Sequence, residues 1–511
     1  MTEYRPVIVG AGIGGLVTGM ILAHRGLSPI IVDRNERVGG KMASVAVDGS
    51  WMDGGPTVLT MLEVFEDLFS ECGMSLHEWV TVEPARVLAR HFWDDGSRLD
   101  LFSNSEASFE SIRDFAGLNE AEGFIRFQRY TAKIYDAVED VFIHGQRPTL
   151  MGAFCKVGLG GVFRLWNADV RRSMHCAIRD YFSDPRLIQL FGRYATYAGN
   201  DPFRTPATFN LIAHVEQRGV WRVVGGMGRL ADALAAQIEA KGGEIRCGEI
   251  VERIEKGPPW RVVTKDKTYL TQTVVFNGDI AALTSARLGN DVSGAAKSYP
   301  KTSRSLSALT WCGRVCVGKV PLLHHNIFFS PNYEEEFDQL TTQRNVPVDP
   351  TVYVCAQDRG DTDEPMDKER LLVLVNAPAV GDDRVVDIQD RQQEIIRCQH
   401  ATFLRLQRAG LNNLNAAEFS RTSPVEWETR FPGSGGAIYG RASRHWTSVL
   451  NRSGARSRLP GLYLVGGSVH PGAGVPMAAL SGRMAAQAIS EDFPLTSKSH
   501  QGDTYGGTLT H

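Results

Sequence analysis

Near its N-terminus the chain reads Val7-Ile8-Val9-Gly10-Ala11-Gly12-Ile13-Gly14-Gly15, and this stretch decides the fold. Its β-branched start is typical of a buried parallel strand, and residues 16–24 read as the helix that follows. Three glycines between them match the pattern G-x-G-x-x-G, namely Gly10, Gly12 and Gly15. Such a turn brings a pyrophosphate close to the backbone at a helix N-terminus. The sequence therefore predicts a dinucleotide-binding unit.

A second strand, expected over residues 27–32, ends at Asp33. A carboxylate at this point can accept hydrogen bonds from the ribose hydroxyls of an adenine dinucleotide. A glycine-rich turn without a ligand is the less favoured interpretation, because the second strand and Asp33 supply the context that the motif requires.

Composition excludes several classes of function. The chain has 511 residues, and its 55 basic and 58 acidic side chains give a formal net charge of −3, so nothing points to nucleic acid. Of the eight cysteines only Cys312 and Cys316 lie close together, without histidines at zinc-ligand spacing. We therefore expect no metal site and free thiols in a reducing cytoplasm. We also expect no signal peptide and no membrane-spanning helix.

The far end of the chain carries a second strand–glycine–helix unit. Residues 462–467 read as a strand that ends in glycines, and residues 478–490 read as a small-residue helix. Further glycine-rich turns lie at residues 39–41, 53–55 and 225–228. A nicotinamide enzyme needs only the first unit, whereas a flavin enzyme must also hold the isoalloxazine ring and the ribityl chain. The sequence therefore favours FAD over NAD.

The middle of the chain is expected to contain the remaining helices and strands. Residues 61–140 read as mostly helical, and 389–409 as a long amphipathic helix. Strands are expected at residues 305–317, 351–356 and 371–376, which predicts an antiparallel sheet beneath the substrate region. A further strand, expected at residues 269–277, belongs to the return of the chain to the first domain. The pair His324-His325 is expected to lie in a solvated loop.

Residues 148–166 form an apolar stretch with four glycines and few charges. We expect this stretch either to touch a membrane surface or to form the mouth of an apolar tunnel. An ordinary core helix and loop is the alternative.

The string His470-Pro471-Gly472-Ala473-Gly474-Val475-Pro476 resembles the flavin-dependent amine oxidase and carotenoid desaturase superfamily, and within it the bacterial-type carotenoid desaturases. Other matching parts are Gly39-Gly40-Lys41, residues 225–228, Gly199-Asn200-Asp201-Pro202, and Glu216 with Gly219-Val220-Trp221. The resemblance covers nearly the whole chain. Residues 477–483 look more like the hydroxyneurosporene or methoxyneurosporene desaturases than the phytoene desaturases. That resemblance implies formation of the C-3,4 double bond in 1-hydroxy or 1-methoxy carotenoids.

The resemblance also implies where FAD would bind. Gly10, Gly12, Gly15 and Asp33 would hold its ADP half, with Val251 meeting the adenine through its backbone. Gly39, Gly40 and Lys41 would lie near the diphosphate, and Asp53, Gly54 and Gly55 near the flavin. Gly466, Gly467, Gly474, Val475 and Pro476 would follow the ribityl chain and the ring. Lys41 departs from the arginine that is common in the superfamily, so it keeps the charge without the fork geometry.

The fold class implied is α/β, with a Rossmann-like FAD-binding domain of the glutathione reductase and amine oxidase type and an inserted substrate domain of mixed sheet plus helices. We predict that the FAD domain is discontinuous, over residues 1–60, 220–290 and 455–495. Residues 61–219 and 291–454 would form the substrate-binding and helical, membrane-facing regions. Residues 496–511 are expected to be a disordered tail.

Desaturation removes a hydride and a proton from adjacent carbons, and the flavin N5 can take the hydride. The resemblance implies no catalytic base. His214, Glu216 and Asp201 are possible proton acceptors, although structural roles are favoured for each, and His470 is expected to position the flavin-binding turn. The expected partner is a lipophilic carotenoid. The protein is expected to be cytoplasmic and to bind peripherally to the inner or intracytoplasmic membrane. The electron acceptor stays open among oxygen, a quinone and a redox protein.

Several alternatives stay open. Within the enzymes they are a phytoene or neurosporene desaturase, a carotene isomerase that uses reduced flavin, and an amine oxidase. Outside the enzymes, a prenyl-binding chaperone of the GDP-dissociation-inhibitor type shares the expected fold. The intact glycine motif and Asp33 argue against the chaperone.

Overall fold

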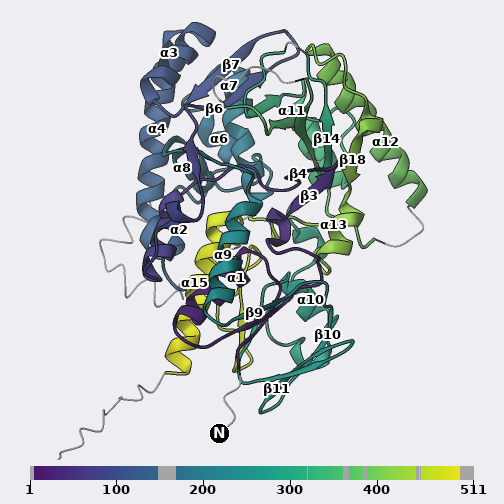
Figure 1. The fold of residues 1–511 in the computed structure, drawn as a ribbon. Coiled ribbons are helices and arrows are strands. Elements are labelled where there is room, and N and C mark those ends of the chain that lie inside the picture. The colour runs from purple at the N-terminus through teal and green to yellow at the C-terminus, as the bar shows by residue number, and fades with distance from the viewer. Residues whose placement is uncertain are drawn as a thin grey trace, which may run out of the picture.

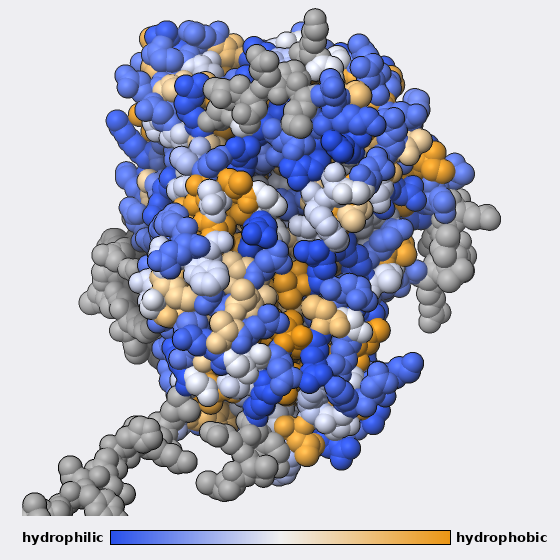
Figure 2. Space-filling model, in the orientation of Figure 1, coloured by the Kyte–Doolittle hydropathy of each residue, from blue (hydrophilic) through white to orange (hydrophobic). Residues whose placement is uncertain are grey.

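The computed structural model describes residues 5–147, 168–318, 320–360, 367–383, 388–444, 448 and 451–494. The apolar stretch 148–166 and the tail 496–511, for which the sequence made predictions, both lie outside the described residues. None of the described helices has the length and apolarity needed to cross a bilayer. On the face shown in Figure 2, hydrophilic residues dominate the surface and hydrophobic residues gather near its middle.

A five-stranded parallel sheet occupies the lower part of the molecule in Figure 1. Three distant stretches of the chain supply its strands, in the spatial order β19 (Leu462–Leu464), β13 (Val274–Phe276), β1 (Val7–Val9), β2 (Ile30–Val32) and β9 (Glu244–Arg246). The order runs outward from β1 in both directions, so β1 lies at the switch point. In open sheets of this kind, ligands bind in the crevice beyond the carboxyl ends of the strands.

Three helices pack together against this sheet, namely α1 (Ile13–His24), α9 (Gly228–Ala240) and α15 (Val475–Asp492). Helix α1 lies between the other two and is buried along all but its last residue, which explains why its sequence is apolar on every side. The other face of the sheet packs against a three-stranded antiparallel sheet, β10 (Val251–Glu255), β11 (Trp260–Thr264) and β12 (Thr268–Thr271).

A seven-stranded mixed sheet fills the upper part of the molecule (Figure 1). Its spatial order is β18 (Phe419–Thr422), β14 (Ser307–Val315), β17 (Glu369–Ala377), β16 (Val352–Ala356), β15 (His325–Phe328), β6 (Val87–Phe92) and β7 (Arg98–Phe102). Helices α3 (Ser105–Ala116) and α4 (Leu118–Val138) flank one side, and α12 (Ile388–Arg408) flanks the other. Aromatic residues of α4 and α12 complete the two cores.

Shorter elements connect these layers. The helices are α2 (Leu62–Glu71), α6 (Met174–Ile178), α7 (Pro185–Gly192), α8 (Leu211–Gln217), α10 (Ile280–Thr284), α11 (Tyr333–Asp338) and α13 (Pro424–Arg430). The strands are β3 (Ser44–Val47) paired with β4 (Ser50–Asp53), and β5 (Val82–Pro84) paired with β8 (Trp221–Val223).

One expectation about secondary structure was wrong, and another was incomplete. Residues 61–140 contain the expected helices α2, α3 and α4, but strands β5, β6 and β7, which were not expected, lie between α2 and α3. The stretch 269–277 is not one strand, because β12 ends at Thr271 and β13 begins at Val274 in a different sheet. The Thr271 hydroxyl accepts a hydrogen bond from the Thr273 backbone N–H at 3.0 Å, which holds the corner between them.

Candidate functional site

A cavity of about 1030 Å³ lies beyond the carboxyl ends of β1 and β2. Its volume is at the upper end of the range for small-molecule sites. Most of the residues predicted to bind the cofactor line it, namely Gly10, Gly12, Asp33, Gly39, Gly40, Lys41, Gly55, Val251, Gly466, Gly467, Gly474 and Val475. The structure therefore brings both glycine-rich units of the sequence into one site, which we call the dinucleotide cavity.

The first glycine turn is closed by an asparagine that sequence reasoning missed. Asn277 Nδ2 donates a hydrogen bond to the Gly10 carbonyl at 3.0 Å, and Asn277 itself lines the dinucleotide cavity. Gly15 does not line it; a Cβ there would lie 2.2 Å from the Gly10 oxygen, so this glycine serves the packing of α1 on β1. A polar residue directly after strand β13, at the switch point, was the signal that could have identified Asn277.

Asp33 fixes the same turn from the neighbouring strand. Its buried carboxylate accepts hydrogen bonds from the Ala11 N–H at 2.6 Å and from the Asn35 N–H at 2.7 Å. A carboxylate can accept about four hydrogen bonds, and Asp33 uses three of them, the third from the Asn35 side chain. It therefore retains an acceptor position on the wall of the cavity, as ribose recognition requires.

The N-termini of α1 and α15 meet at the dinucleotide cavity. Their N-cap residues, Gly12 and Gly474, both line it, and neither helix has a side-chain cap. A Cβ on Gly14 would lie 2.9 Å from the Gly466 backbone nitrogen, so the two glycine-rich units touch. Two uncapped helix N-termini in one cavity offer free N–H groups and partial positive charge to an anionic ligand.

Asp53 and Gly54, predicted near the flavin, do not line the dinucleotide cavity or the second cavity that adjoins it. Both carboxylate oxygens of Asp53 lie 2.9 Å from the Met227 N–H, where they cap the N-terminus of α9. Burial raises the pKa of Asp53 to about 6, against the opposing effect of these backbone donors. Gly54 packs against Val45, so both residues support the site from behind.

Lys41 lines the dinucleotide cavity but uses its amine to hold a loop. Its Nζ donates to the carbonyl oxygens of Ala437 and Ile438, at 3.3 and 2.9 Å. Burial lowers its pKa to about 8. Lys41 thus ties the Gly39–Lys41 turn to a segment that lines the site from the far side of the molecule.

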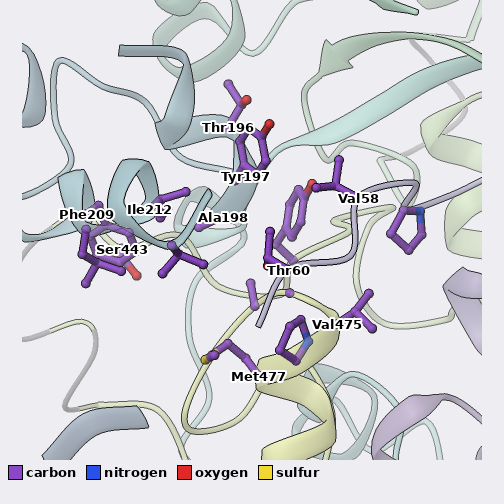
Figure 3. A pocket seen from close by; sticks show the side chains of 18 of the residues that line it. Val58, Thr60, Thr196, Tyr197, Ala198, Phe209, Ile212, Ser443, Val475 and Met477 are labelled. Carbon is purple, nitrogen blue, oxygen red and sulfur yellow. The ribbon is translucent and has the colours of Figure 1, made fainter. Parts of the chain in front are cut away.

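A second cavity, of about 600 Å³, adjoins the first. The two share Gly55, Pro56, Leu374, Ile438, Tyr439, Gly474 and Val475. In Figure 3, Thr196, Tyr197 and Ala198 lie across this cavity from Val475 and Met477, and Phe209, Ile212 and Ser443 form a third side. Pro476, predicted to follow the flavin, also lines it. Because its walls are largely apolar, we call it the apolar cavity.

The residues of the dinucleotide cavity fit FAD. The Thr310 hydroxyl lines the cavity, is buried and has no hydrogen-bond partner among the described residues. Because buried polar groups are normally paired, this hydroxyl can bind a polar atom of a ligand. The cavity extends from Asp33 and Val251, where an adenosine would bind, to the residues shared with the apolar cavity, where the flavin would face a substrate.

Comparison with known proteins agrees with this geometry. The sequence profile of the family described as flavin-containing amine oxidoreductase matches residues 13–490. A hydroxyneurosporene desaturase from Rubrivivax gelatinosus is 42% identical over 100% of this chain and 98% of its own length. A second, from Rhodobacter capsulatus, is 40% identical over 96% of this chain and 98% of its own length. This chain is a flavoprotein of the carotenoid desaturase family.

Solved structures show the same fold for this flavoprotein. An oxidoreductase from Methanosarcina mazei has a TM-score of 0.59 at 16% identity, with 95% of this chain and 100% of that chain covered. Cyclohexylamine oxidase from Brevibacterium oxydans has a TM-score of 0.58 at 13% identity, with 96% and 99% covered. The predicted fold class and the choice of FAD are confirmed, as is an enzyme over a prenyl-binding chaperone. The domain limits and the role of each site residue stay predictions.

None of the possible proton acceptors lines the apolar cavity of the desaturase. Glu216 is buried and accepts hydrogen bonds from the hydroxyls of Tyr194 and Tyr197, the latter at 2.6 Å. Asp201 accepts from the Phe203 N–H at 2.8 Å, and burial raises the pKa of both carboxyls. His214 packs against Tyr135. These contacts support structural roles.

His470 positions the late turn of the desaturase. Its Nε2 lies 2.9 Å from the Gly145 carbonyl oxygen and donates to it, because a carbonyl can only accept. This bond ties the turn before α15 to the end of the segment that follows α4.

The prediction that His324-His325 is solvated was wrong. Strand β15 begins at His325, and His325 lies opposite Cys355 of β16 inside the seven-stranded sheet. His325 is 5% exposed, and its Nδ1 lies 2.7 Å from the Tyr353 hydroxyl. His324 Nδ1 donates to the Arg359 carbonyl at 2.9 Å, and its Nε2 lies 3.5 Å from Cys355 Sγ. Burial lowers the pKa of both imidazoles, that of His324 to about 4.

Arg193 is another cavity residue that the sequence prediction missed. It lines the apolar cavity of the desaturase directly after α7. A charged residue inside the otherwise uncharged run 187–195 was a signal that it contacts a specific group.

Proposed function

We propose that this protein introduces the C-3,4 double bond into acyclic 1-hydroxy or 1-methoxy carotenoids. The observation that carries the proposal is its full-length similarity to the hydroxyneurosporene desaturases, at 42% identity over the whole chain. A protein named 1-hydroxycarotenoid 3,4-desaturase, from a Flavobacterium, is also similar, at 27% identity over 95% of this chain. The apolar cavity next to the dinucleotide cavity suits a long hydrocarbon substrate.

The chemistry divides between cofactor and protein. Bound FAD supplies the acceptor for the hydride. A double bond forms when one carbon loses a hydride and its neighbour loses a proton, so the target bond must be held in one place and kept dry. The side chains of Val58, Ile212, Val475 and Met477 give the apolar cavity a hydrophobic wall. Ile438 and Tyr439, at the boundary of the two cavities, would orient the bond.

A substrate panel tests the proposal against the alternatives. Purified enzyme loaded with FAD is offered phytoene, neurosporene and 1-hydroxyneurosporene, and the products are separated by chromatography and weighed by mass spectrometry. We expect 1-hydroxyneurosporene to be converted fastest, with the loss of two hydrogens. Conversion of phytoene alone would contradict the proposal, and a product of unchanged mass would identify an isomerase.

We also propose that the enzyme works on the cytoplasmic side of the inner or intracytoplasmic membrane, bound peripherally. Two observations support this. The segment 148–166 is apolar in sequence, and described residues on both sides of it, Phe142, Ile143, Ala168 and Val170, line the apolar cavity. A lipophilic substrate could then pass from the bilayer to the flavin without crossing water.

A further inference from the structure

Arg193 is a cation on the wall of the apolar cavity. Its guanidinium carbon lies 5.5 Å from the ring centres of Tyr197 and of Tyr353. Among the ion pairs of the described residues, none involves Arg193, and the nearby carboxylate of Glu216 is held by two tyrosine hydroxyls instead. Burying a charge without an opposite charge costs free energy, so this arrangement calls for a polar partner.

Tyr333 adds an unsatisfied hydroxyl to the same cavity. It lines the cavity at the start of α11, and its hydroxyl is buried without a hydrogen-bond partner among the described residues. The ring is fixed by Phe337, with centroids 5.0 Å apart, and by Phe329, 6.2 Å away. Native proteins pair nearly all buried polar groups. A hydrocarbon alone would leave the Tyr333 hydroxyl unpaired, and it would add no polar partner to Arg193, whose guanidinium has five N–H donors and the Tyr197 hydroxyl as a hydrogen-bond partner.

The position of Arg193 relates it to the flavin end of the cavity. Arg193 packs on Tyr353, and Tyr353 lies directly opposite Leu374 in the antiparallel pair β16–β17. Opposite residues in such a pair have Cβ atoms about 5 Å apart. Leu374 lines both cavities. Arg193 therefore lies about one side chain away from the place where the two cavities meet.

We propose that Arg193 and Tyr333 donate hydrogen bonds to the oxygen at C-1 of the carotenoid and so select the bond that reaches the flavin. This assignment rests on the proposed function. Arginine can donate but not accept, which suits a hydroxyl and a methoxyl oxygen equally. The target bond begins two carbon–carbon bonds from C-1, so fixing that one oxygen fixes the register of the chain against the flavin.

The test compares two substrates that differ only at C-1 and C-2, where 1-hydroxyneurosporene carries a hydroxyl and a hydrogen in place of the double bond of neurosporene. The FAD-loaded variants Arg193→Met, Arg193→Lys and Tyr333→Phe are assayed with 1-hydroxyneurosporene and with neurosporene. We measure kcat and KM for each, and binding by fluorescence quenching in case neurosporene is bound without conversion. The matched control is Arg186→Met on α7, whose guanidinium pairs with Asp184 at 2.6 Å and lines neither cavity.

We expect Arg193→Met to lower the preference for the hydroxylated substrate by about 10- to 100-fold, the effect of losing one buried hydrogen bond to a charged group. Tyr333→Phe should lower it less, and Arg193→Lys should retain part of it. The flavin spectrum should not change. If the wild type has the preference and Arg193→Met keeps it, or slows both substrates equally, the anchor is wrong while the proposed function stands. If the wild type has no preference, the proposed substrate is itself wrong.

Discussion

The buried carboxylate of Asp53 shows how one residue can support the cofactor site without touching it. It lies at the end of β4 and caps α9, while its own backbone N–H and carbonyl bind the side-chain amide of Gln357, each at 2.8 Å. Asp53 thereby joins the helical layer around the FAD site to the seven-stranded sheet of the upper region. The pKa of about 6 reflects the cost of keeping this charge away from water.

That raised pKa predicts a pH-dependent contribution to stability. The native protein binds the Asp53 proton more tightly than the unfolded chain does, so the free energy of unfolding falls as the pH rises from about 4 to about 6. Asp53→Asn keeps an acceptor for the Met227 N–H but cannot ionise. Its stability relative to the wild type should increase by up to about 3 kcal/mol between pH 4 and pH 7.

Unfolding of the FAD-loaded proteins, followed by flavin fluorescence and circular dichroism at several pH values, measures the difference. Asp48→Asn, in the exposed turn between β3 and β4, is the control and should track the wild type throughout. A stability difference between Asp53→Asn and the wild type that is the same at every pH would disprove the interpretation.

At the scale of elements, the contact of α1 with α15 positions the N-termini of both helices at the dinucleotide cavity. The helices approach closely at Gly482, where a Cβ would lie 2.4 Å from the Gly14 carbonyl oxygen and 3.0 Å from Val17 Cβ. The neighbouring Thr18 hydroxyl donates to the Gly14 carbonyl at 2.8 Å, so little room remains for adjustment.

Gly482→Ala should therefore push α15 away from α1. We expect a loss of about 1–3 kcal/mol in the free energy of unfolding, typical of overpacking, together with weaker FAD binding, because the N-terminus of α15 moves. Gly294→Ala is the control, since a Cβ there would have no neighbour within 4 Å. Equal flavin retention by Gly482→Ala and the control, measured after dialysis, would argue against this coupling.

Elements with a strong local pattern could be predicted from the sequence, and elements that depend on distant partners could not. Strand β1, helix α1 and helix α15 follow from β-branched runs and glycine turns. Strands β6 and β7 were missed because β6 is completed by β15, whose Asn326 pairs with Arg90. The pairing of β15 with β16, in which His325 lies opposite Cys355, places His325 inside the sheet, and this explains why two adjacent histidines were misjudged as solvated.

The residues of the site also fall into those that a local sequence pattern predicts and those that depend on distant parts of the chain. Glycines could be predicted because a turn next to a phosphate leaves a fixed spacing in the sequence. Asn277, Arg193 and Tyr333 carry no such spacing, and only the fold brings them to a cavity wall.

At the scale of the whole molecule, the apolar cavity and the segment 148–166 predict a membrane contact. Substituting Phe154→Asp and Phe163→Asp together should weaken binding to vesicles of phosphatidylcholine and phosphatidylglycerol by about tenfold or more, because charged groups are costly in an apolar phase. Co-sedimentation measures this. Turnover of substrate dissolved in detergent should be retained.

The matched control is Val348→Asp with Ile396→Asp, two substitutions at side chains that are exposed in the structure, at 61% and 45%. This pair should leave vesicle binding unchanged. Undiminished sedimentation of the Phe154 and Phe163 double variant would place the membrane contact elsewhere.

The five-stranded parallel sheet has a consequence for biosynthesis. Its strands come from residues 7–9, 30–32, 244–246, 274–276 and 462–464, and α15 begins only at Val475. A ribosome must therefore release nearly the whole polypeptide before the FAD site can form. Until then the apolar faces of β1 and α1 lack the elements that cover them, and chaperones can bind such exposed surfaces. The yellow colour of bound FAD in a preparation would then indicate that translation had reached the last helix. A prematurely terminated chain would lack half of the flavin site and would not retain the cofactor.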